Sequence, residues 1–299
     1  MVSKPTTVTY RIFASGYCTA HDWIVDPKNG HGKAKFYATW LLIEHPTHGL
    51  YLFDTGYSPR FLEATRHFPD KFYGWATPAF IRDEETAVSK LAQLGIKPLD
   101  LSGMIISHFH ADHVAGMLDF PKIPILCHPE ALKQVLSVNG FGAVRHGIVK
   151  ALIPKDLEER GHVIADYKSA AENVWIINPD EQWTVRRAII NPDERISSIQ
   201  FHDLFGDGTV GLAYLPGHAR GQLGVRIHAA DHTLFFATDA AWRKSALEAN
   251  ILPSPTVKLF FDDWQAYKAT FAALRDYQAT FPTHRLLFTH CPQTMNYIA

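Results

Sequence analysis

The segment Ser-His-Phe-His-Ala-Asp-His, residues 107–113, constrains the fold most, because it holds four side chains that can bind metal. It follows the apolar run 104–106, which predicts a buried strand ending at Ser107, and a helix is expected to begin near Asp112. In extended backbone, His108 and His110 project to the same side, whereas the adjacent Asp112 and His113 cannot both join them. The spacing therefore predicts two metal ions side by side, each held by one pair.

Two metal ions need more ligands than this segment supplies, and three further candidates follow short apolar strands. His218 follows the expected strand 210–215, Asp239 follows 234–238, and His290 follows 285–288. Ligands at separate strand ends can converge on one edge of a sandwich. Imidazole and carboxylate donors favour zinc as the divalent cofactor, with iron, manganese and cobalt as alternatives.

The composition is that of an ordinary globular protein, with 46% hydrophobic and 20% charged residues. A formal net charge of -1 provides no overall field for nucleic acid or membrane, so we expect a small-molecule substrate, and a homodimer stays open. The three cysteines are too few and odd in number for a disulfide framework. No signal-like or membrane-length apolar run is present, so a cytoplasmic location is expected.

Strand and helix patterns alternate along the chain, which predicts an α/β fold. The expected strands are 8–13, 35–44, 50–53, 104–106, 123–126, 174–177, 210–215, 223–227, 234–238 and 285–288. The expected helices are 83–94 with Asp83 as its N-cap, 129–136 with a proline in the first turn, and the amphipathic helix 262–281. Residues 138–168 are expected to be an insertion, and His128 is expected to cap or pack.

Two features near the first hairpin have open interpretations. The carboxylate of Asp54 either braces a metal ligand from behind or caps a turn. From Tyr57 to Arg82 the periodicity fails while aromatic residues accumulate between prolines. Such a stretch is either a loop packed on the core or the wall of a substrate pocket, and the pocket interpretation makes Phe72 and Trp75 substrate-binding residues.

Together, residues 107–113, Pro216-Gly217-His218, Thr238-Asp239 and Thr289-His290 resemble the metallo-β-lactamase superfamily over nearly the whole chain. The resemblance implies an αβ/βα four-layer sandwich of the α/β (α+β) class. It also implies one domain over 1–299 with two similar halves, roughly 8–170 and 174–299. By the same resemblance, His108, His110 and His218 hold one metal, Asp112, His113 and His290 hold the other, and Asp239 bridges them.

Within that superfamily the chain looks most like the quorum-quenching N-acyl homoserine lactonases, through residues 54–56, the ligand set and the segment 239–241. Those lactonases usually carry a carbonyl-directed tyrosine three residues after the bridging aspartate, where this chain has Trp242. The expected reaction is attack of a metal-activated hydroxide on the acyl carbon of a lactone or ester, with Asp112 or Asp239 guiding the proton to the leaving alkoxide.

Rival functions come from several classes of protein. A thioesterase of the hydroxyacylglutathione hydrolase type is expected to show a basic patch, which the sequence does not reveal, and a nuclease or phosphodiesterase is disfavoured by the neutral charge. A zinc β-lactam hydrolase often uses cysteine at the second site, and a flavodiiron oxidoreductase has glutamate where His110 stands. A non-enzymatic metal-binding sensor is disfavoured because no ligand position is lost.

Overall fold

The computed structural model describes residues 7–28, 30, 32–158 and 199–299 of the chain. The predicted strand 174–177 and residues 159–168 of the predicted insertion lie outside the described residues. Among the described residues, no helix is both long enough and apolar enough to cross a lipid bilayer.

The first sheet is built from the N-terminal part of the chain and has the strand order β4-β1-β2-β3-β5-β6. Its strands β1, β2 and β3 pair antiparallel, whereas β3, β5 and β6 pair parallel. The parallel pairs bring the carboxyl ends of β3, β5 and β6 to one edge. The strand bounds are β1 Thr9–His21, β2 Lys33–His45, β3 Gly49–Phe53, β4 Ala79–Phe80, β5 Leu101–Ile105 and β6 Ile125–Leu126.

The second sheet is built from the C-terminal part and has the order β11-β10-β9-β8-β7. All its neighbouring strands pair antiparallel except β10 and β11, which are parallel. The strand bounds are β7 Phe201–Asp203, β8 Val210–Tyr214, β9 Leu223–His228, β10 Thr233–Phe236 and β11 Arg285–Leu287.

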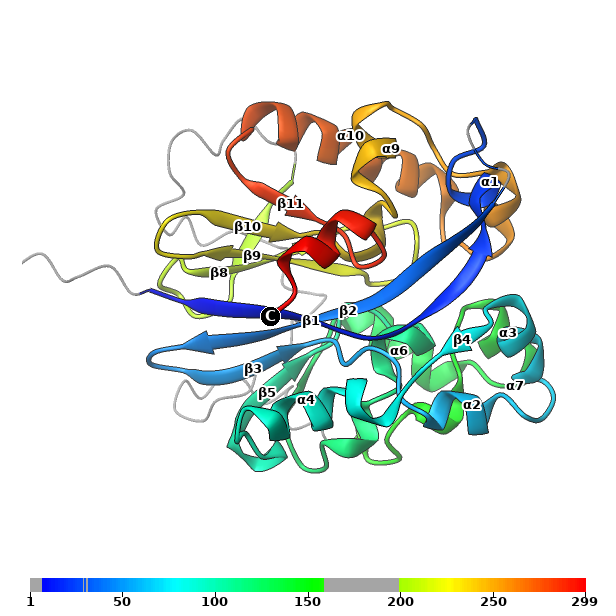
Figure 1. Ribbon diagram of the computed structural model, residues 1–299, viewed down its shortest axis with the longest axis horizontal. Coiled ribbons are helices and arrows are strands. Elements are labelled where there is room, and N and C mark those ends of the chain that lie inside the picture. The colour runs from blue at the N-terminus through cyan, green and yellow to red at the C-terminus, as the bar shows by residue number, and fades with distance from the viewer. Residues whose placement is uncertain (1–6, 29, 31, 159–198) are drawn as a thin grey trace, which may run out of the picture.

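Helices cover the outer faces of the two sheets (Figure 1). The α-helices are α1 Asp22–Val25, α2 Arg60–Ala64, α3 Lys71–Ala76, α4 Ala87–Gln93, α5 Ala111–Val114, α6 Pro129–Ser137, α7 Gly140–Arg145, α9 Lys244–Glu248 and α10 Trp264–Thr280. Short 3-10 helices are η1 Asp83–Glu85, η2 Pro98–Asp100, η3 Met117–Asp119, η4 Lys150–Leu152, η6 Thr238–Ala240, η7 Pro255–Leu259 and η8 Pro292–Tyr297.

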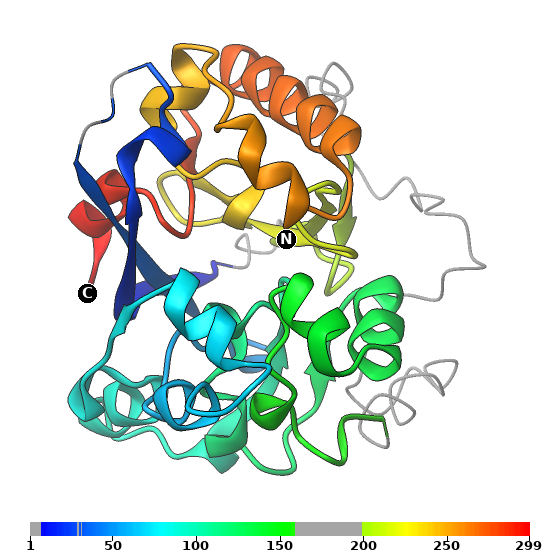
Figure 2. The same cartoon turned by 90° about the vertical axis from the view of Figure 1, so that its right-hand side faces the viewer.

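The order of layers follows from the two-residue period of the strands. In β2, Trp40 and Leu42 pack with α4 and α6 on the outer face, whereas Leu41 and Ile43 pack against the second sheet. In β10, Phe235 packs with α10 on the opposite outer face. Strands buried on both faces are apolar at nearly every position, as these are. The chain therefore forms helix, sheet, sheet and helix layers, which confirms the predicted four-layer sandwich (Figures 1 and 2).

Two predicted elements differ from the structure. Asp83 does not cap a long helix, because residues 83–85 form η1 and the side chain of Thr86 accepts a hydrogen bond from the Ser89 amide at the start of α4. The aperiodic stretch 57–82 contains the helices α2 and α3 and the strand β4. Each of these elements is too short to produce a periodic pattern. By contrast, the His128 side chain caps α6, as predicted, and Asp263 caps α10.

Candidate metal centre

The predicted ligands come together where the strands end. His108 follows β5, His110 precedes α5, Asp112 and His113 lie in α5, and His218, Asp239 and His290 follow β8, β10 and β11. Ligand atoms lie within 4.8 Å of one another in each of three overlapping groups. We call the first group, His108, His110 and His218, the imidazole triad, and the second, Asp112, His113 and His290, the mixed triad. The third group contains His108, His113 and Asp239.

Asp239 lies between the two triads. Its Oδ2 is 3.3 Å from Nε2 of His218 and 2.8 Å from Nε2 of His290. Its Oδ1 is 3.4 Å from Nε2 of His113. One carboxylate therefore contacts both triads, which is the position expected of a bridging ligand.

The donor atoms of the site are arranged as metal ligands would be, because several are buried without a hydrogen-bond partner in the described part of the chain. His108 Nε2, His113 Nε2 and Asp239 Oδ1 are buried with no hydrogen-bond partner among the described residues. In the imidazole triad, Nδ1 of His110 faces Nε2 of His218 at 3.0 Å. Buried polar atoms are normally satisfied, so donor atoms that converge without hydrogen-bond partners fit a site that binds a cation. Imidazole and carboxylate donors suit a divalent metal such as zinc.

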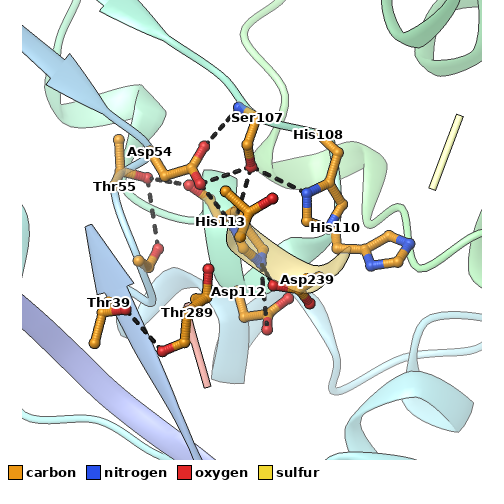
Figure 3. Close-up of polar contacts among 12 residues, drawn as sticks. Thr39, Asp54, Thr55, Ser107, His108, His110, Asp112, His113, Asp239 and Thr289 are labelled. Carbon is orange, nitrogen blue, oxygen red and sulfur yellow. Dashed lines mark hydrogen bonds and ion pairs between the residues drawn. The ribbon is translucent and has the colours of Figure 1, made fainter. Parts of the chain in front are cut away.

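Asp54 lies behind the mixed triad (Figure 3). Its carboxylate accepts a hydrogen bond from Nδ1 of His113 at 2.8 Å and two from Ser107, from the amide and the hydroxyl, both at 2.7 Å. The backbone of Asp54 is left-handed, with a φ of 63°, at the turn that follows β3. With Nδ1 donating to Asp54, the lone pair of His113 is on Nε2 and points to the ligand atoms.

His290 is oriented in the same way, by an acceptor that the sequence did not indicate. Its Nδ1 lies 2.8 Å from the backbone oxygen of Tyr37 in β2. The hydroxyl of Thr39 donates to the backbone oxygen of Thr289 at 2.7 Å, which joins the two sheets next to this ligand. A backbone acceptor on another sheet leaves no local motif, so sequence alone could not have found it.

The two triads differ in their pKa values. Burial lowers the pKa of the imidazole triad, to about 3 for His110 and His218 and well below the usual range for His108. Burial also acts to lower the pKa of His113 and His290, but the surrounding carboxylates, Asp239 first among them, together outweigh burial and raise both pKa values. Burial acts to raise the pKa of Asp239, yet His290 and His113 hold it well below its usual value.

One wall of the site is aromatic. The ring of Trp242 lies edge-on to the rings of His218, Phe36 and Phe261, with centroid separations of 5.9, 5.6 and 5.5 Å. Trp242 therefore contacts the imidazole triad directly. Sequence reasoning missed Phe36 and Phe261, because nothing in their local patterns marks a position beside a ligand.

The other aromatic residues predicted to bind substrate lie on α3, and no ring contact joins them to a candidate ligand among the described residues. Phe72 and Trp75 are 45% and 59% exposed and contact Phe68, and Phe72 also contacts Phe141 of α7. Between them, Tyr73 turns toward the core beside Phe61. The structure thus places Phe72 and Trp75 in an exposed cluster, not among the ligands.

No cysteine contributes to the donor groups found in the described part of the chain. Cys18, Cys127 and Cys291 are buried free thiols. Burial raises the pKa of Cys18 to about 12, with a further contribution from Asp112. The donor set is therefore histidine and aspartate, unlike that of hydrolases with cysteine at the second site.

A model of the metallo-beta-lactamase superfamily matches residues 35–284, which is most of the chain. The chain belongs to this superfamily. The four-layer fold and the convergent histidine and aspartate groups agree with that assignment.

Relatives include a probable metallo-hydrolase of Mycobacterium bovis, 26% identical over 214 residues, which are 70% of this chain and 58% of the relative. The N-acyl homoserine lactonase AttM of Azorhizobium caulinodans is 22% identical over 142 residues, 48% of this chain and 41% of its own length. The match thus spans little more than half of the first relative. Among solved structures, B. thuringiensis AiiA with bound N-decanoyl-L-homoserine superposes with a TM-score of 0.69 at 17% identity, covering 99% and 98% of the two chains.

Proposed function

We propose that the chain is a dinuclear metal hydrolase that opens a hydrophobic lactone, in particular an N-acyl homoserine lactone, and so quenches quorum signals. The position of Asp239 carries this proposal, since one carboxylate contacts both the imidazole triad and the mixed triad. His108, His110 and His218 would hold one ion, and Asp112, His113 and His290 the other. We propose zinc for both ions because the donors are imidazole and carboxylate.

When bound, two such ions supply Lewis acidity, which polarises a carbonyl oxygen and lowers the pKa of water. The chain itself moves the proton. Asp112 has a 10% exposed side chain against 2% for Asp239, so Asp112 is the carboxylate that faces incoming substrate. We assign the proton transfer to Asp112: its carboxylate would take the proton released by the attacking water and pass it to the ring oxygen as the acyl C–O bond breaks, while Asp239 would help to hold both ions.

The surroundings of the site support a substrate with an apolar group. Trp242 and Phe261 form an aromatic wall against His218, and Phe36 extends it from Trp242 to His290. The indole N–H of Trp242 can donate one hydrogen bond but cannot exchange a proton as a phenol can. An apolar acyl chain gains about 0.8 kcal/mol for each buried methylene. The exposed aromatic cluster on α3, with Phe72 and Trp75, would extend this apolar surface.

Lactonase relatives support the same substrate class, as do lactonase structures of the same fold. The three free cysteines agree with a reducing, cytoplasmic location, which we propose with the activity.

A hydrolysis panel tests the proposal. The zinc-loaded protein is assayed on acyl homoserine lactones of short and long chain, a simple lactone, a glutathione thioester, a phosphodiester and a β-lactam. We expect the highest kcat/KM on the long-chain homoserine lactone. Preference for the thioester would assign the chain to the hydroxyacylglutathione hydrolase type, and preference for the phosphodiester or the β-lactam would replace the lactonase assignment by that class.

If no substrate is hydrolysed, the result is informative only when the metal content of the protein is also known. The panel is therefore run with elemental analysis of the same preparation and with an Asp239→Ala variant as the negative control. Two ions per chain with no hydrolysis of any substrate would favour a metal-binding sensor over an enzyme.

A further inference from the structure

The end of α7 lies against the imidazole of His110. The amide of Gly147 donates to the oxygen of Val144, and the amide of Ile148 donates to the oxygen of Ala143, both at 3.0 Å. This is the pattern of a Schellman cap, in which the glycine has left-handed backbone. Gly147 has a φ of 68° and meets that requirement.

The His110 ring, which lies outside the helix, also requires a glycine at position 147. A Cβ at this position would lie 2.5 Å from Cδ2 of His110 and 2.9 Å from both Cγ and Nε2 of the same ring. Any side chain would therefore overlap the imidazole. Because Nδ1 of this ring lies 3.0 Å from Nε2 of His218 in the imidazole triad, a displacement of the ring would also move its donor nitrogen.

His110 needs this support more than the other ligands do. It is partly exposed, whereas the other six candidate ligands are buried. No carboxylate or backbone acceptor is found behind it in the described residues, in contrast to His113 and His290. The Gly147 oxygen also accepts a hydrogen bond from the amide of Ala111 at 3.1 Å, which fixes the backbone directly after His110.

We propose that Gly147 is a positioning residue of the metal centre: the cap of α7 seats the His110 imidazole in its metal-binding orientation, and only glycine leaves room for the ring. This inference rests on the proposed dinuclear centre. It gives the predicted insertion a function, because residues 140–147 complete the support of a ligand whose own segment provides none.

The chain contains a matched control in Gly95. This glycine caps α4 with the same two hydrogen bonds, from Gly95 to Ala92 at 3.0 Å and from Ile96 to Leu91 at 2.9 Å. Its φ of 76° is close to that of Gly147, but a Cβ there would meet nothing within 4 Å. Gly95→Ala therefore introduces the same backbone strain without a clash, and the difference from Gly147→Ala isolates the contact with His110.

The first readout is metal affinity, measured by zinc competition with a chromophoric chelator. We expect Gly147→Ala to weaken the imidazole-triad site at least about tenfold, as loss of a group that orients a ligand does, and Gly95→Ala to leave it unchanged. Wild-type affinity in Gly147→Ala would overturn the inference. Absence of zinc from the wild-type protein would instead overturn the proposed dinuclear centre.

The second readout needs no metal. Thermal unfolding of the chelator-treated proteins is compared in the wild-type and His110→Ala backgrounds. We expect Gly147→Ala to lower the Tm more than Gly95→Ala in the wild-type background, and by the same amount once the ring is removed. An excess loss that persists without the ring would overturn the inference. If Gly147→Ala does not fold, recovery of folding in the double variant supports it, and failure of both while Gly95→Ala folds opposes it.

Discussion

The two triads use similar residues but differ in the protonation state of their histidines. The imidazole triad is held neutral by burial, which lowers the pKa of His110 and His218 to about 3. The mixed triad is surrounded by carboxylates, so the pKa of His113 and His290 is raised and a proton competes with metal. Because metal ligands must be deprotonated, the two sites should differ in how metal affinity depends on pH.

They also differ in how their rings are oriented. His113 and His290 of the mixed triad donate to acceptors behind them, the Asp54 carboxylate and the Tyr37 backbone oxygen. In the imidazole triad, His110 is held by contact with Gly147. Ser107 and Asp54 support both His108 and His113, so the difference between the triads lies in His110, which depends on packing, and in His290, which depends on a backbone acceptor.

The largest effect is expected from removing the residue that the triads share. Asp239→Ala should lower kcat/KM by more than about 100-fold, because it deletes a ligand in contact with both triads. Asp54→Ala should cost about 10- to 100-fold, since it removes no candidate ligand and disturbs only the orientation of His113 and of Ser107 beside His108. Steady-state kinetics with a metal count of each variant checks this order. Equal losses with full metal retention would count against the bridging role of Asp239.

The pH dependence of metal retention sharpens the comparison. A group with a raised pKa is protonated at any pH below that value, so His113 and His290 must release protons when they bind metal. The metal affinity of the mixed triad therefore decreases as the pH decreases. The loss is about tenfold per pH unit for each proton displaced. His110 and His218, with pKa values of about 3, carry almost no proton to displace between about pH 5 and pH 8.

Equilibrium dialysis at fixed free zinc, followed by elemental analysis, measures this. We expect two ions per chain near pH 8 and a fall toward one as the pH decreases. His290→Ala, which retains only the imidazole triad, should hold one ion across the range, and His110→Ala should lose its ion on acidification. A wild-type content of one ion or fewer at every pH would contradict the dinuclear proposal, and the reverse order of loss would contradict the assigned triads.

The convergence of the candidate ligands was predictable because each follows a strand or lies in one compact motif. His218, Asp239 and His290 are far apart in sequence, but a common position after an apolar strand indicated that they meet. The layer order was predicted through the resemblance to the superfamily, and the burial of β2 on both faces agrees with it. What could not be predicted depends on contacts between distant segments: the Tyr37 oxygen behind His290, the Phe261 ring beside Trp242, and the close approach of Gly147 to His110.

Phe72 and Trp75 show a different limit. An aromatic-rich stretch indicated a pocket wall but not which side chains face inward, because α3 is only six residues long and has no measurable period. Whether these two residues bind the substrate stays a prediction. Neither residue is a metal ligand in any of the three donor groups.

The smallest effect is expected at Trp242, which contacts only the imidazole triad, through His218. Trp242→Tyr replaces an indole with a phenol, which can donate a hydrogen bond to a substrate carbonyl, and it removes apolar surface from the wall. One hydrogen bond contributes about 1 kcal/mol, or about fivefold in rate. We therefore expect kcat/KM on short-chain homoserine lactones to rise about fivefold relative to long-chain ones. Trp242→Phe removes the N–H without adding a hydroxyl and serves as the control.

The ratio of the two substrates, not the rate on either, decides the role of Trp242. A change in metal content would lower both rates together, because both substrates use the same ions, so it leaves the ratio unchanged. A shift in the ratio in Trp242→Tyr but not in Trp242→Phe assigns it to the new hydroxyl. A shift in both variants assigns it to the lost indole surface beside Phe36 and Phe261. An unchanged ratio in both would mean that Trp242 only packs against His218, and that substrate choice is made elsewhere in the site.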